Sequence, residues 1–157
     1  MNTKQSDNII PATFVKTTTI IHLALVMGQV LFAATTLLNS KNRVQPQSDD
    51  LFKYMAPALA LSGFVIGHFL FLKFLGNIKR DSPLKTKLAA YQSATIVRLA
   101  LLEGPSLFAI VCFMLTRNMM FIGISGAIIL YFIYLRPTRQ KVEDDLALDY
   151  NEKAELN

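Results

Sequence analysis

The sequence has few of the residues on which most catalytic and metal sites depend. It contains a single cysteine, Cys112, so no intramolecular disulfide can form and no metal-ligand pattern is present. No serine, cysteine or aspartate stands beside a plausible base, no glycine-rich phosphate loop occurs, and no predicted helix carries paired carboxylates. These absences argue against an enzyme, and we expect no cofactor and no bound metal.

Charged residues are also scarce, at 17% of the 157 residues, whereas 52% are apolar. A soluble domain of this length would interleave polar residues at helical or strand period, but here they fall in short blocks between long apolar runs. A helix needs about 20 apolar residues to cross the hydrocarbon core of a bilayer, and four runs reach or approach that length. Because backbone amides in lipid must be satisfied within the segment, each run is predicted to be helical.

We therefore expect an all-α fold, a bundle of four transmembrane helices at about 17–38, 51–75, 88–115 and 119–136. The third helix is allowed an extension back to Leu84. The first run is too long for the apolar region of a secretory signal, which favours an uncleaved first helix.

One membrane domain over 17–136 then lies between an N-terminal arm, 1–16, and a C-terminal tail, 137–157. In the tail, Val142 and Leu146 are four residues apart, which fits a short amphipathic helix as well as a solvated tail.

Net charge is +5, and the basic residues are distributed unevenly between the two sides of the predicted membrane domain. Lys73, Lys79 and Lys85 lie around the loop between the second and third helices, and Arg136 and Lys141 follow the fourth. By the positive-inside rule, that loop and both termini are cytoplasmic, in a bacterial inner membrane. The expected partners are the bilayer, with its anionic headgroups, and other membrane-protein subunits or further copies of the chain, with no nucleic acid.

Small residues recur at helix-packing spacing in three of the predicted helices. The second helix carries one stripe of them, formed by Ala56, Ala60, Gly63 and Gly67. The first has Ala24 and Gly28, and the fourth has Gly123 and Ala127, both four residues apart. Such residues let helix backbones approach closely in lipid. We interpret these small residues as packing contacts between helices of one chain. The alternative is that they pack helices of two copies of the chain together.

Five polar residues lie within the apolar runs, where charged groups are costly. Arg98 and Glu103 are in the third helix, His22 and Gln29 in the first, and His68 in the second. His22, His68, Arg98 and Glu103 fall in the cytoplasmic half of the predicted bundle, and Gln29 reaches its midplane. We predict that these residues form a polar cluster.

The role of Glu103 stays open between two readings. Its short side chain does not reach water from this depth, so it must pair, bind a proton or face a wet cavity. Pro105 frees the carbonyl of Leu101, and a bend there could bring Glu103 to Arg98 or aim it at His22 or His68. A structural ion pair and a protonatable site are the two alternatives.

The run "ALLEGPSLFAIVCFML" resembles the second helix of the c-type proteolipid subunits of rotary ATPases. Those helices carry a mid-membrane carboxylate followed after five residues by an aromatic one, as Phe108 follows Glu103 here. The basic loop with Lys79 and Pro83 is similar to the polar loop of those hairpins. The resemblance covers residues 79–115 and implies that Glu103 carries an ion. The second helix lacks the glycine repeat of those rings, and Arg98 lies near the carboxylate.

The whole chain also resembles a group of small four-helix inner-membrane proteins of Bacteroidota whose activity is not known. The residues behind this resemblance are "RLALLEGPSLF" and "YLRPTRQKVEDDLAL". Together with the polar cluster, it leads us to expect a non-enzymatic oligomer or accessory subunit of a membrane assembly. The alternative function is transfer of protons or cations at Glu103.

Overall fold

The computed structural model describes residues 11–39, 50–79 and 81–156, and every regular element in these ranges is an α-helix. The four long helices are α1 (Pro11–Asn39), α2 (Phe52–Gly76), α3 (Leu84–Thr116) and α4 (Met119–Tyr134), and two short ones, α5 (Arg139–Asp145) and α6 (Tyr150–Glu155), follow them. The all-α prediction is thus confirmed for the described ranges. Of the predicted arm 1–16, residues 1–10 lie outside them.

Several helix ends differ from those expected. α1 begins at Pro11 rather than at 17, and proline suits the first turn because its missing N–H has no partner there anyway. α3 begins at Leu84, the allowed extension. α4 ends at Tyr134, two residues early. The ring of Pro137 disfavours helical geometry in the residue before it, which explains the early end.

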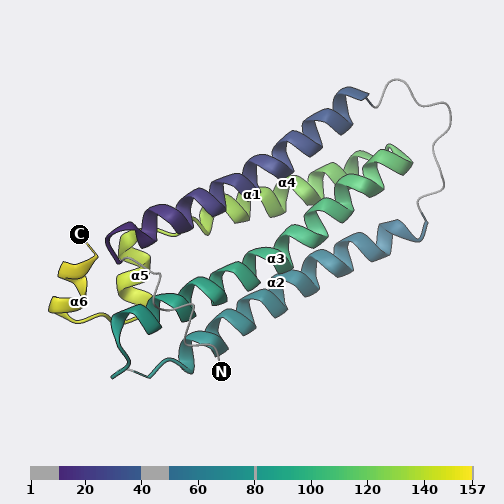
Figure 1. Cartoon of the computed structure of the whole chain (residues 1–157). Helices are drawn as coiled ribbons and strands as arrows, with labels where there is room; N and C mark the ends of the chain where they lie inside the picture. The colour runs from purple at the N-terminus through teal and green to yellow at the C-terminus, as the bar shows by residue number, and fades with distance from the viewer. Residues whose placement is uncertain (1–10, 40–49, 80, 157) are drawn as a thin grey trace.

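α3 is the central helix, and it packs against α1, α2 and α4 (Figure 1). It ends in a tight turn at Arg117, whose φ of 59° is left-handed, as at many helix C-termini. The Asn118 side chain then accepts a hydrogen bond from the Met120 N–H and caps the start of α4. This short connection makes α3 and α4 antiparallel neighbours.

The contact between α2 and α3 depends on the predicted small-residue stripe of α2, in which Ala56, Gly63 and Gly67 are buried. A β-carbon added at Gly63 would overlap the carbonyl oxygen of Leu101 and come within 2.9 Å of Pro105 Cγ. One added at Gly67 would contact the Arg98 carbonyl oxygen at 3.5 Å. Glycine therefore lets the two backbones meet at this seam.

The predicted pairs in α1 and α4 do not form such seams. Gly28, Gly123 and Ala127 are exposed, and a β-carbon added at either glycine meets no atom within 4 Å. An intrachain seam at these positions is therefore not present, because neither small residue of each pair faces another helix of the chain. Ala24, one turn before Gly28, is exposed as well.

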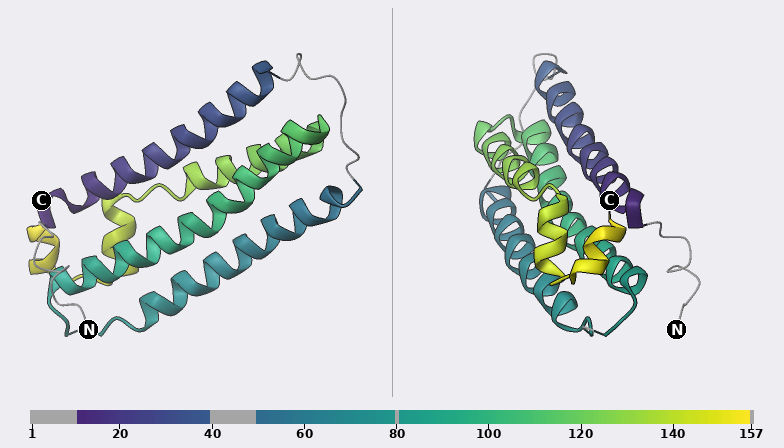
Figure 2. Two further views of the ribbon diagram at one scale, coloured as in Figure 1. Left: turned by 45° about the vertical axis from the view of Figure 1, so that its right-hand side comes forward. Right: turned by 90° about the vertical axis from the view of Figure 1, so that its left-hand side faces the viewer.

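α5 and α6 lie across one end of the long helices, which we call the capped end (Figure 2). It comprises the start of α1, the end of α2, the start of α3 and the end of α4. Apolar side chains hold the cap there. Val142 of α5, Leu146 directly after α5 and Leu156 after α6 belong to one buried cluster with Phe14, Phe71 and Leu88. Of the two readings of the tail, the amphipathic helix is the one formed.

Three of the described helices, α1, α2 and α3, are long and apolar enough to cross a membrane. α4 passes the same test only together with α5, across a bend of 79°. The chain therefore has three or four candidate membrane-spanning helices and is that of a multi-pass membrane protein. α5 carries five charged residues among its seven, so we treat it as lying outside the spans.

Candidate functional site

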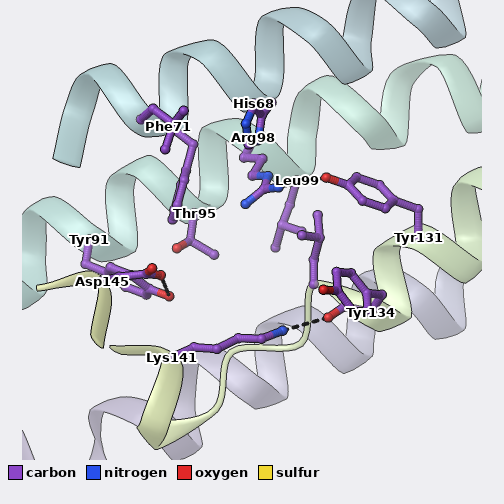
Figure 3. Close-up of a pocket in the computed structure, with 12 residues that line it drawn as sticks. His68, Phe71, Tyr91, Thr95, Arg98, Leu99, Tyr131, Tyr134, Lys141 and Asp145 are labelled. Atoms are coloured by element: carbon purple, nitrogen blue, oxygen red, sulfur yellow. Dashed lines mark hydrogen bonds between the residues drawn. The ribbon is translucent and has the colours of Figure 1, made fainter. Parts of the chain in front are cut away.

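A cavity of about 390 Å³ opens at the capped end between α2, α3, α4 and α5 (Figure 3). We call it the capped-end cavity. Its polar and aromatic lining includes His68 and Phe71 of α2, Tyr91 and Arg98 of α3, Tyr131 of α4 and Lys141 of α5. It is open on the outer side of the helices, where Leu72 and Tyr134 line it and are 54% and 73% exposed.

Arg98 is held in this cavity by two aromatic rings. Its guanidinium carbon lies 4.8 Å from the centre of the Phe71 ring and 5.9 Å from that of Tyr131. Nη2 donates a hydrogen bond of 2.7 Å to the Tyr131 hydroxyl. Nε is buried and has no hydrogen-bond partner in the part of the chain that the structure describes. A guanidinium has five N–H donors, so Arg98 is fixed in place while still able to donate to a further acceptor.

Lys141 brings a second positive charge to the cavity. Its Nζ donates to the Tyr134 carbonyl oxygen at 2.7 Å and lies 4.9 Å from the centre of the Tyr134 ring (Figure 3). It also reaches the Arg136 carbonyl at 3.4 Å. The last carbonyls of a helix have no partner within the helix, and cationic side chains are favourable there. Lys141 therefore caps the end of α4 and faces the cavity at the same time.

One carboxylate, Asp145, also lines the cavity. It accepts a hydrogen bond of 3.2 Å from the Tyr91 hydroxyl. Packing of the carboxyl group removes part of its hydration, and this raises the pKa of Asp145 above its ordinary value. Among the described residues no ion pair joins Asp145 to Arg98 or to Lys141. The cavity lining thus holds two cations and one anion.

Two other acidic side chains near this end are paired with cations outside the cavity lining. Glu152 forms an ion pair of 2.6 Å with Lys87, whose side chain is only 6% exposed. Glu143 pairs with Arg139 and lies 3.9 Å from Lys153. Neither carboxylate is therefore in an ion pair with Arg98 or Lys141.

His22, predicted to join the polar cluster, is buried and contacts α4. Its Nε2 lies 2.7 Å from the Phe132 carbonyl oxygen. Because a carbonyl only accepts, this nitrogen is the protonated one. Nearby, the Thr19 hydroxyl donates to the Pro137 carbonyl at 3.2 Å. α1 therefore makes polar contacts with the last turn of α4 and with the segment that follows it, and His22 does not line the capped-end cavity.

Farther along the helices, polar groups form a second, smaller set that we call the middle layer: Gln29, Ser106 and Ser125. Ser106 and Ser125 are fully buried and hydrogen-bond each other at 3.0 Å. Gln29 is 1% exposed, and neither its amide nitrogen nor its amide oxygen has a partner.

The register of α1 and α4 puts Gln29 at the level of that serine pair. The two helices run in opposite directions and touch at His22 and Phe132. Gln29 is two turns after His22, and Ser125 is two turns before Phe132. The buried amide of Gln29 thus lies at the same depth as the serines, on the side of α1 that packs inward.

Glu103 is half-buried and lies beside this layer. Around α3 it is about 40° from Leu99 and about 60° from Ser106, at the edge of the buried face. Among the described residues it forms no ion pair, so of the two alternatives for Glu103 the pair with Arg98 is absent. Arg98, about 7.5 Å nearer the capped end along the helix, bonds to Tyr131 instead.

The structure thus divides the predicted cluster. Arg98 and His68 share the capped-end cavity, His22 is at the end of α4, and Gln29 and Glu103 lie deeper. Sequence reasoning missed Tyr91, Lys141 and Asp145 as cavity residues. The signal that could have placed them was the apolar pair Val142 and Leu146, which brings α5 back onto the helices.

Comparison with protein-family models, curated proteins and solved structures finds no match for this chain. The two resemblances seen in the sequence therefore stay predictions, and the function is inferred from the contacts and the cavity of the described residues.

Proposed function

We propose that this chain is a multi-pass protein of a bacterial inner membrane, without enzymatic activity, that works as an oligomer or as an accessory subunit of a larger membrane assembly. Four helices, α1 to α4, cross the bilayer as a bundle in this proposal. Both termini and the capped end face the cytoplasm.

The observation that carries the membrane placement is the outward apolar surface of α1 and α2. Large side chains point away from the rest of the chain along both helices, among them Ile20, Leu23 and Leu31 in α1 and Leu61, Val65 and Phe69 in α2, each between 54% and 65% exposed. Soluble monomers rarely expose apolar surface over such lengths. In a bilayer, lipid chains would cover this apolar surface and keep it out of contact with water.

The uncovered small residues of α1 and α4 support action with a partner. Ala24 and Gly28, and likewise Gly123 and Ala127, present backbone that no helix of this chain covers. In lipid, close approach of two helices at small residues is a main source of association. The chain has already used one such stripe internally, in α2, which shows that its helices pack in this way.

The basic residues support the orientation. Lys79, Lys85, Arg136 and Lys141 lie at the capped end of the described chain, whereas Lys53 and Arg117 lie at the other. An excess of Lys and Arg in short loops favours the cytoplasmic side.

The association test substitutes leucine for the exposed glycines, one at a time, in Gly28→Leu and Gly123→Leu. A β-carbon added at either glycine meets no described atom within 4 Å, and both positions are exposed, so folding should be unchanged. In a mild detergent, light scattering and co-isolation should find the wild type with a second copy or another membrane subunit, and at least one variant without it.

The matched control is Val65→Phe, which adds bulk to an exposed position of α2 on the face opposite Gly63 and Gly67. This variant should associate as the wild type does. A wild-type protein that is monomeric and co-isolates with nothing contradicts the proposal.

A second candidate function is transfer of a proton or cation at Glu103, and the middle layer favours it. Neither amide atom of Gln29 has a partner among the described residues, at the level of two hydroxyl groups, and Glu103 of α3 is half-buried. Buried polar groups without protein partners are ordinarily satisfied by water or an ion. A wet path at this depth is what a transfer function requires.

Flux in proteoliposomes separates the two functions. If Glu103 carries the ion, Glu103→Gln abolishes proton or cation flux, and carbodiimide labels Glu103 in the wild type with labelling suppressed at high pH. Adding Gln92→Glu to the Glu103→Gln variant places a carboxyl group on α3 nearer the capped end, and this double variant should still show no flux. Equal flux in wild type and Glu103→Gln ends this candidate.

A further inference from the structure

The capped-end cavity is a site that the proposed functions do not use. We propose that it binds the phosphate group of an anionic phospholipid, held by Arg98 and Lys141, with the acyl chains lying along the outer surface of α2 and α4. This assignment goes beyond the accessory-subunit proposal and does not depend on a partner protein.

The charge of the cavity selects an anion. Among the described residues no ion pair joins a carboxylate to Arg98 or Lys141, although Asp145 attracts both cations through space, and Glu143 and Glu152 are paired with other cations. The one lining carboxylate, Asp145, is held by the Tyr91 hydroxyl. A planar guanidinium and an ammonium group facing one space suit the oxygens of a phosphate.

The state of Arg98 shows that the cavity is built for a further acceptor. Phe71 and Tyr131 hold its guanidinium in place, yet Nε is buried with no acceptor. The Thr95 hydroxyl also lines the cavity, beside the Tyr91 hydroxyl. Unmade hydrogen bonds of buried donors are costly, so a ligand that supplies an oxygen to Arg98 Nε would be favoured here.

The position of the cavity favours a lipid over a soluble anion. Leu72 and Tyr134 line it on the outer side of the helices, and both side chains are largely exposed. The same outer surface continues with exposed apolar residues, Phe69 on α2 and Leu130 on α4. Tyrosines near the end of a span are typical of the headgroup level. Basic pockets between helices at this level bind anionic headgroups.

The test measures lipid retention by native mass spectrometry of the full chain, with phosphatidylglycerol, phosphatidylcholine or inorganic phosphate added. The wild type should retain phosphatidylglycerol in preference to phosphatidylcholine. Arg98→Gln and Lys141→Gln should each lower that retention about fivefold, as expected for loss of one basic group near the headgroups. Glutamine at 141 keeps an N–H donor for the Tyr134 carbonyl, so the end of α4 stays capped.

Two further variants guard against a loss caused by misfolding. Lys85→Gln removes an exposed charge of α3 that does not line the cavity, and it should leave retention unchanged. Asp145→Asn removes the only lining carboxylate and still accepts from Tyr91, so it should raise retention of phosphatidylglycerol about fivefold. A damaged fold does not produce such a gain.

Three results would overturn the proposal. One is equal retention of phosphatidylglycerol and phosphatidylcholine by the wild type. Another is an effect of Lys85→Gln as large as that of Arg98→Gln. The third is displacement of the lipid by millimolar inorganic phosphate, which would assign the cavity to a soluble anion instead.

Discussion

The capped end and the middle layer solve the same problem, the burial of polar side chains among apolar helices, in different ways. At the capped end, Lys87 is nearly buried and meets Glu152, and Tyr91 meets Asp145. In the middle layer, Ser106 and Ser125 satisfy each other, but Gln29 satisfies neither of its amide atoms.

The two regions differ because more hydrogen-bond and ion-pair partners are present at the capped end than in the middle layer. α5 and α6 bring carboxylates, cations and free helix ends to the capped end, where water is also near. Apart from the Leu101 carbonyl that Pro105 frees, the middle layer has only the side chains of the crossing helices, since the other backbone groups inside a long helix are paired with each other. Polar residues there are few, and each unpaired one is a candidate for function.

The largest effect is expected at the α2–α3 seam, which joins the two regions. Gly63→Leu drives a side chain into the Leu101 carbonyl and Pro105, and should lower the free energy of unfolding by more than about 3 kcal/mol. Gly28→Leu, on an open face, should change it by less than about 0.5 kcal/mol. Thermal unfolding in one detergent compares the stability of the two variants. Equal losses of stability would contradict close packing of α2 and α3 at Gly63.

A somewhat smaller effect tests the capped end. Glu152→Gln leaves the buried Lys87 ammonium without its carboxylate and should cost about 3 kcal/mol of stability. Glu155→Gln, an exposed charge on the same helix, should cost little. Proteolysis of the C-terminal segment reports whether α6 has come loose. If proteolysis cleaves the C-terminal segment of both variants at the same rate, the ion pair between Lys87 and Glu152 does not hold α6 in place.

The smallest effect, of opposite sign, tests the middle layer. Gln29→Leu removes an amide that has no partner and should raise stability by about 1–2 kcal/mol. Ser106→Ala instead breaks the bond to Ser125 and should lower stability by about 1 kcal/mol. Denaturant titration in detergent measures both changes. A loss at Gln29→Leu would show that its amide has partners after all.

The sequence predicted most of the fold because the apolar runs and their lengths are local properties. The positions of α1, α2 and α3 follow from them, and the tight contact at Gly63 follows from residue size. The early end of α4 is also local, since Pro137 accounts for it.

The site was harder to predict because it depends on contacts between distant segments. Depth along each helix grouped Arg98 with His68 and placed Gln29 farther in. It could not show that Arg98 bonds to Tyr131 rather than to Glu103, because that choice depends on which faces of α3 and α4 meet. The cavity itself exists only because α5 turns back across the helix ends, which places Lys141 and Asp145 opposite α3.

The most direct test of the account is the depth of Glu103 relative to the two ends of the helices. In a Cys112→Ala background, single cysteines at 50, 85 and 103 would be exposed to a membrane-impermeant maleimide in vesicles of each orientation. The account predicts that Asp50→Cys reacts only in right-side-out vesicles, Lys85→Cys only in inside-out vesicles, and Glu103→Cys in neither. Reaction of Glu103→Cys as fast as that of Lys85→Cys would place residue 103 in bulk water and contradict the account.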